Sequence, residues 1–434
     1  MKSNKPTVLS NFHTTLGIIA LILLPLPGKP AYIGMLLLIL PLLRLPTTLK
    51  TLCAFLQKPI VLFLLVWCLF AYISILWSEN PNRSLLTSPL ILIIIPSLYP
   101  LKEKSKYLIL ALGFGVAIHT TIQVLMWLGV MHGVRYGPGT ISGGLHWYPP
   151  FTALWSSASM FLLLGLAFTT PSRRTAVLAT LLLIPVPLSL LISGNKTVFF
   201  VIPIATIFLA IQCVSLTKTR RKRIAIIVIC SFIIFITICF SFVPGTTVSK
   251  RNAVLLKQTM KATNLNKPQH QSKKKTLPKE LREVRVDRYV SSFGLRYVWW
   301  RAGYIIWKES PWIGHGAGAS LKQFAWAESQ IPTERGADVE GFITPEPHSS
   351  ILATAIEQGL LGILLITSSV LFALIRSWRF MSANPSLIGL SAAWVSVIAF
   401  GFVHTIQFST YASTLILVLF VFTLYQYPKV EKAV

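Results

Sequence analysis

Long apolar runs separated by short polar segments dominate the pattern of residues along this chain. A helix that crosses a bilayer needs about 20 apolar residues, and such runs predict about twelve spans here. The first run has no small-residue cleavage site, so we interpret it as a span and not as a signal peptide. The expected spans lie near residues 12–27, 30–47, 58–78, 84–101, 106–131, 148–170, 174–192, 196–217, 223–243, 348–376, 384–405 and 408–427. The fold class expected from this pattern is an all-α polytopic membrane protein.

Composition agrees with a membrane protein. The 434 residues are 53% hydrophobic and 12% charged, against about 25% charged residues in soluble proteins. The net charge of +27 suits cytoplasmic loops and anionic lipid headgroups, so membrane lipids are the expected partners and nucleic acid is not. The five cysteines all fall in or beside apolar segments, so no disulfide framework is predicted.

The basic residues of the short loops predict the orientation. With the N-terminus in the cytoplasm, nineteen of them fall on the inside and four on the outside, as the positive-inside rule requires. Both termini are therefore expected in the cytoplasm. The predicted organisation is a transmembrane region of about nine spans over 1–243, an external loop over 244–347, and about three further spans over 348–434.

One part of the long loop, Ser291 to Ala319, contains a stretch with helical periodicity. Its apolar positions follow helical spacing, and Pro311 ends the pattern. Its aromatic residues favour a helix at the outer membrane surface, which carries Arg296 and Arg301. Arg296 either anchors this helix at the lipid headgroups or recognises an anion, since guanidinium pairs well with phosphate oxygens. The apolar positions are Leu295, Val298, Trp299, Ala302, Ile305 and Ile306.

His348 follows two prolines, where the long loop returns to the membrane. Ser349 and Ser350 come next and are typical of a helix start. A histidine here is either structural or a general base, because its pKa lies near neutral pH. Glu357, the one acid within an expected span, lies nine residues on and about 180° around the helix. It is either a paired packing group or a functional carboxylate.

Two other external motifs carry a single basic residue. "SGNKTVFF" places Lys196 at the start of a span, and "GVRYGPGTISGGLHWYPP" contains Arg135 in a glycine-rich segment. Each is either turn chemistry with one anchoring charge or part of an anion site. The chain has neither paired external carboxylates nor an HExxH motif, so neither a metal nor another cofactor is expected. The remaining histidines weighed for a role are interpreted as structural: His119, His132, His315 and His404.

Four of these pieces, in this order, resemble the bacterial superfamily of O-antigen ligases and polymerases. They are "RYGPGTISGG", "SGNKT", "FGLRYVWWRAGYIIWKESPWIGHGAG" and "PHSSILATAIEQGLLGILL", of which the last two are the most specific. The resemblance places His348, Glu357 and Gly359 at the family's hallmark helix and Arg296 at its periplasmic arginine. Two positions depart from the family: Ser349 replaces a frequent asparagine, and Lys196 replaces a frequent arginine. Lysine keeps the charge but lacks the bidentate fork of a guanidinium.

The resemblance implies a C-type glycosyltransferase fold in the bacterial inner membrane, with the active site facing the periplasm. It implies metal-independent, inverting transfer of a glycan from undecaprenyl diphosphate to lipid A–core. His348 is then the candidate base, and Arg296 the candidate stabiliser of the leaving diphosphate. Arg135, Lys196, Arg301 and Glu357 are the expected substrate-binding residues. An O-antigen or exopolysaccharide polymerase and a protein O-oligosaccharyltransferase remain alternatives, as does a transporter or flippase, although that class predicts internal repeats.

Overall fold

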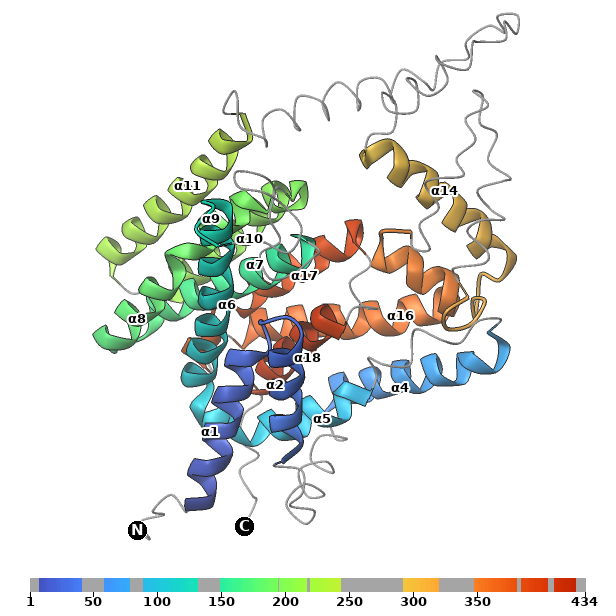
Figure 1. Cartoon of the computed structure of the whole chain (residues 1–434), viewed down its shortest axis with the longest axis horizontal. Helices are drawn as coiled ribbons and strands as arrows, with labels where there is room; N and C mark the ends of the chain where they lie inside the picture. The colour runs from blue at the N-terminus through green and yellow to red at the C-terminus, as the bar shows by residue number, and fades with distance from the viewer. Residues whose placement is uncertain are drawn as a thin grey trace, which may run out of the picture.

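The computed structural model describes most of the chain, and its regular elements are all helices (Figure 1). The described residues are 8–40, 58–78, 89–131, 149–193, 195–216, 219–242, 292–319, 347–380, 384–404 and 410–426. Arg135 and most of the expected periplasmic loop lie outside them. The all-helical class is therefore confirmed for the part of the chain that the structure describes, while the division into 1–243, 244–347 and 348–434 stays a prediction.

The helices are named here in chain order with their bounds. The α-helices are α1 (Val8–Leu23), α2 (Lys29–Ile39), α4 (Pro59–Ile73), α5 (Pro89–Leu98), α6 (Ser105–Trp127), α7 (Pro149–Thr169), α8 (Arg173–Leu183), α9 (Pro185–Ile192), α10 (Lys196–Leu216), α11 (Arg220–Phe242), α14 (Ser292–Glu309), α16 (Ser350–Arg379), α17 (Leu390–Val403) and α18 (Thr410–Leu424). The 3₁₀ turns are η2 (Ser74–Trp77), η4 (Tyr99–Lys104) and η6 (Pro385–Leu387).

Six helical segments among the described residues are long and apolar enough to cross a membrane, and four shorter apolar helices accompany them. This shows a polytopic membrane protein, whereas the expected count of twelve spans stays a prediction. The span expected over 174–192 consists of two helices, α8 and α9, which meet at Ile184 and Pro185. Proline has no N–H to continue the helical ladder, which accounts for the interruption.

The centre of the bundle is formed by α7, α10, α17 and α18. Trp155 and Trp394 are buried there, and the Trp394 indole N–H donates to Thr423 Oγ1 at 3.0 Å. Small residues let the backbones approach closely here. A Cβ on Gly165 would overlap the backbone of Gly389, so α7 and the start of α17 could not be this close with a larger residue. Close packing and interhelical hydrogen bonds are the usual means of association where lipid removes most of the hydrophobic driving force.

α16 is broken at Gly359, which has φ 63° and ψ −161°, a conformation essentially restricted to glycine. The break leaves backbone groups on both sides without helical partners, and the turn after α14 supplies them. His315 N–H donates to Ile356 O at 2.8 Å, and Leu360 N–H donates to Pro311 O at 2.8 Å. Non-helical backbone at membrane depth is tolerated where protein satisfies it in this way.

The same turn also bonds to the end of α4, so three distant segments meet. Ala317 N–H donates to Ser74 Oγ at 3.2 Å, and Ser78 Oγ donates to Ala317 O at 2.6 Å. Trp67 Nε1 donates to Gln358 Oε1 at 2.7 Å. We call this meeting point of 311–319, α4–η2 and the break of α16 the junction (Figure 1).

We expect Gly359→Ala to destabilise the protein by about 2–6 kcal/mol, because an alanine suffers both the backbone strain and a clash. A Cβ at position 359 would overlap the backbone of Trp312. Gly28→Ala is the matched control, since Gly28 also has positive φ (76°) but nothing lies within 4 Å of its Cβ position. Thermal unfolding of the two purified variants in detergent measures the difference. Equal melting temperatures would show that the junction does not require this glycine.

Candidate functional site

His348 lies immediately before α16 and has an unusual backbone. Its φ is 47°, and it is the one non-glycine residue with positive φ among those the structure describes. Ser349 caps the helix, since its Oγ accepts from Leu352 N–H at 3.4 Å. A residue other than glycine persists in such a conformation only where its surroundings impose it, and these positions cluster at functional sites.

α14 holds the imidazole in place. The ring of Trp299 lies against the ring of His348, with centroids 4.5 Å apart and planes at 38°. Trp299 belongs to a small buried cluster with Ala302, Ile306 and Ile356, which attaches α14 to the first half of α16. Half-buried, His348 retains partial access to solvent.

His404, interpreted as structural from the sequence, connects α16 to α10. Its carbonyl accepts from Ser350 Oγ at 2.9 Å, and its Nε2 lies 3.2 Å from Thr197 Oγ1. The start of α10 and the start of α16 therefore lie at the same end of the bundle. This arrangement brings the backbone of Lys196 to the region of His348, although the two residues are 152 positions apart.

Asn195 is a polar residue of this region that the sequence interpretation did not single out. Its Oδ1 accepts from Thr197 N–H at 3.0 Å, which caps the start of α10. The side chain is 9% exposed, and its buried Nδ2 has no hydrogen-bond partner among the described residues. A buried donor at the positive end of a helix is a suitable contact for an anionic group. The signal in the sequence is an asparagine one position before a span that begins with Lys196.

The other expected site residues fall at different places. Arg296 lies on α14 one turn before Trp299, and its side chain, like that of Lys196, lies outside the described part. Arg301 is exposed on α14. Glu357 is 2% exposed, and it lies at the junction, where its carbonyl accepts from Gly316 N–H at 2.9 Å. It is about 13 Å further along the helix axis than His348.

An apolar cavity of about 220 Å³ opens beside the start of α16. Ser350 and Ile351, which follow His348 closely in the chain, line it together with Val370 and Leu371. Side chains of α17 and α18 complete the lining, and the walls are almost entirely apolar. The arrangement places a lipid-compatible space next to the candidate base.

Comparison with known proteins agrees with these observations. A family model described as O-antigen ligase matches residues 158–367, just under half of the chain. The match includes Lys196, Arg296, His348 and Glu357, and it excludes Arg135. No curated protein matches the chain. The match implies an enzyme of the glycosyl-transfer type in a membrane, and it confirms the resemblance of this chain to the O-antigen ligase superfamily.

Proposed function

We propose that this protein is an O-antigen ligase that transfers a glycan from undecaprenyl diphosphate to lipid A–core. The observation that carries the proposal is the placement of His348. It has a left-handed backbone, lies against Trp299 and lies at the bundle end where α10 also begins. The proposed location is the inner membrane, with both termini in the cytoplasm and this bundle end at the periplasmic surface.

In the proposed reaction, His348 accepts the proton of the acceptor hydroxyl as that oxygen attacks the anomeric carbon of the donor. The bond from this carbon to the diphosphate oxygen breaks, and the diphosphate leaves with the electron pair. Attack from the side opposite the leaving group inverts the anomeric configuration.

The leaving diphosphate needs positive charge, which the proposal assigns to protein groups in place of a metal. Arg296 is the principal stabiliser, and Lys196, Arg135 and Arg301 add to the positive field. Asn195 Nδ2 adds a neutral donor at the start of α10. Fixed donors of this kind stabilise developing charge without having to reorganise during the reaction. Glu357 acts indirectly in this scheme, because its backbone belongs to the junction that holds α16.

The apolar cavity beside Ser350 is the proposed position of the polyprenyl chain. We expect Ile366→Trp, which fills the cavity, to raise the KM for a long-chain donor several-fold more than for a short-chain analogue. Leu364→Trp is the matched control, because Leu364 lies on the same helix, is 55% exposed and does not line the cavity. Initial rates with both donors measure the effect. Equal changes in the two variants would remove the cavity from the proposal.

The acceptor is tested by the glycolipids of a deletion strain. A ligase predicts free lipid A–core together with polymer that accumulates on the carrier. A polymerase instead predicts lipid A–core capped with single repeats. Normal lipopolysaccharide with loss of a glycoprotein would indicate a protein O-oligosaccharyltransferase, and polymer trapped on the cytoplasmic side would indicate a flippase.

A further inference from the structure

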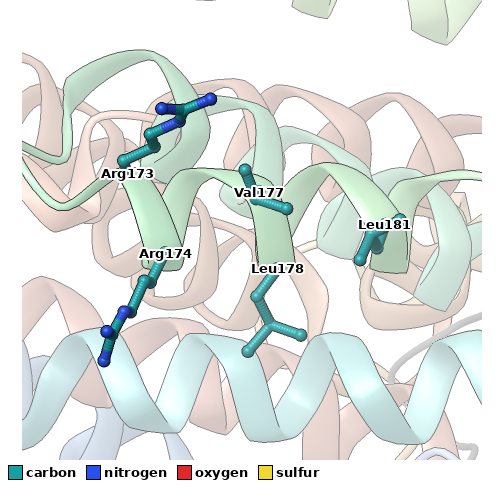
Figure 2. Close-up of a pocket in the computed structure, with 5 residues that line it drawn as sticks. All are labelled: Arg173, Arg174, Val177, Leu178 and Leu181. Atoms are coloured by element: carbon teal, nitrogen blue, oxygen red, sulfur yellow. The ribbon is translucent and has the colours of Figure 1, made fainter.

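A second basic feature lies at the start of α8, outside the candidate site. An open groove of about 480 Å³ is lined by two arginines and three aliphatic side chains of this helix. Figure 2 shows Arg173 and Arg174 at one end, directed to opposite sides of the helix, with Val177, Leu178 and Leu181 following. The groove combines a cationic end with an apolar floor.

The groove lies at the opposite end of a candidate membrane span from the start of α10. The segment Arg173–Ile192 is long and apolar enough to span a membrane, and Ile192 lies three residues before Asn195. Twenty helical residues rise about 30 Å, which equals the thickness of the hydrocarbon core. A membrane span formed by this segment would place the arginines at the membrane face opposite to the candidate site.

The side chains of the two arginines have no partner among the residues that the structure describes. Both are exposed, and neither forms a hydrogen bond or an ion pair with another residue that the structure describes. They occupy the first turn of α8, where the helix dipole disfavours cations. Both guanidinium groups add positive charge at this end of the helix, and a single guanidinium can pair with two phosphate oxygens.

The aliphatic residues distinguish a lipid from a free anion. Val177, Leu178 and Leu181 are 50%, 43% and 54% exposed, so protein does not cover them. They follow the arginines at intervals of one and two helical turns. A headgroup alone would not contact them, whereas an acyl chain attached to that headgroup would.

We propose that this groove binds an anionic phospholipid of the leaflet opposite to the candidate site. Its phosphate is bound by the guanidinium of Arg174, Arg173 adds positive charge from the other side of the helix, and one acyl chain lies along Leu178. The inference does not depend on which glycan or acceptor the enzyme uses.

The test is lipid binding to the purified protein in neutral detergent, followed by native mass spectrometry and thermal unfolding. We expect phosphatidylglycerol to bind and stabilise the wild type more than phosphatidylcholine does. Arg173→Gln combined with Arg174→Gln should weaken phosphatidylglycerol binding about 30-fold, the effect expected for two basic residues at an anionic surface. Glycerol phosphate should not compete, because it lacks the acyl chain.

Two further variants keep the test decisive. Lys222→Gln combined with Arg223→Gln removes the same charge from exposed positions near the start of α11, and it should change binding only slightly. Leu178→Trp keeps both arginines but fills the groove, and it should also weaken phosphatidylglycerol binding. Equal losses of phosphatidylglycerol binding in the two double variants would show that the lipid is attracted to positive surface charge in general, and would overturn the proposal. Unchanged binding in Leu178→Trp, or competition by glycerol phosphate, would overturn the acyl-chain part.

Discussion

Replacement of His348 by asparagine is expected to lower the transfer rate by about 10²–10⁴, the usual contribution of a general base. Asparagine tolerates positive φ better than most residues, so the backbone at φ 47° should persist while the titratable group is lost. His348→Ala should be equally inactive but less stable, because alanine tolerates this backbone less well. Single-turnover rates with purified enzyme and a lipid-diphosphate donor measure the loss.

The control for His348 is a change at the ring that contacts it. Trp299→Phe retains an aromatic contact with the imidazole, so we expect most of the activity to remain. Melting temperatures of all variants should accompany the rates, since a misfolded protein is also inactive. Transfer at the wild-type rate by a folded His348→Asn enzyme would exclude the histidine as the base.

Arg296→Ala is expected to lower the transfer rate by about 10²–10³, the effect of losing one electrostatic stabiliser of a transition state. Arg296→Lys should fall part of the way, because lysine keeps the charge but not the planar fork that binds two phosphate oxygens. If Arg296 only anchors α14 at the headgroups, lysine should function almost as well as arginine. Kinetics with the lipid-diphosphate donor separate the two roles.

Lys308→Ala is the matched control on the same helix. Lys308 lies near the other end of α14, where its ammonium group is 5.2 Å from the centre of the Tyr304 ring. The substitution removes one positive charge from α14 at the end away from Trp299, which contacts His348. The transfer rate should therefore remain close to that of wild type. A similar loss of rate in Arg296→Ala and Lys308→Ala would point to general surface charge and count against a specific phosphate contact.

Local patterns in the sequence predicted those elements that depend on neighbouring residues. The spacing from Leu295 to Ile306 predicted a helix, and the structure contains α14 over Ser292–Glu309. The serines after His348 predicted a helix start, and Ser349 caps α16. These outcomes follow from helical periodicity and capping, both of which act over a few residues.

Features that depend on distant partners were not predictable in the same way. The break at Gly359 lies within one continuous apolar run, and its cause is the turn at 311–316, about 45 residues earlier. His404 was interpreted as structural, but the sequence could not show which segments it joins, because its partners Thr197 and Ser350 are 207 and 54 residues away. Asn195 was not singled out as a candidate site residue, because the interpretation of this motif rested on the charge of the neighbouring Lys196. The residue pattern of a single segment does not show which distant residues that segment will contact.

The order in which the chain is synthesised matters for the formation of the junction. The turn that satisfies the backbone at the break of α16, and the α4–η2 segment that bonds to this turn, both precede α16 in the chain. They are therefore synthesised before the carbonyls of Ile356 and Glu357 leave the ribosome. The broken helix can find its partners as it enters the bilayer, so its unpaired backbone need not remain in lipid. A circular permutation that moved 292–319 behind α16 would reverse this order, and such a chain should insert poorly even though every contact of the finished structure is still available.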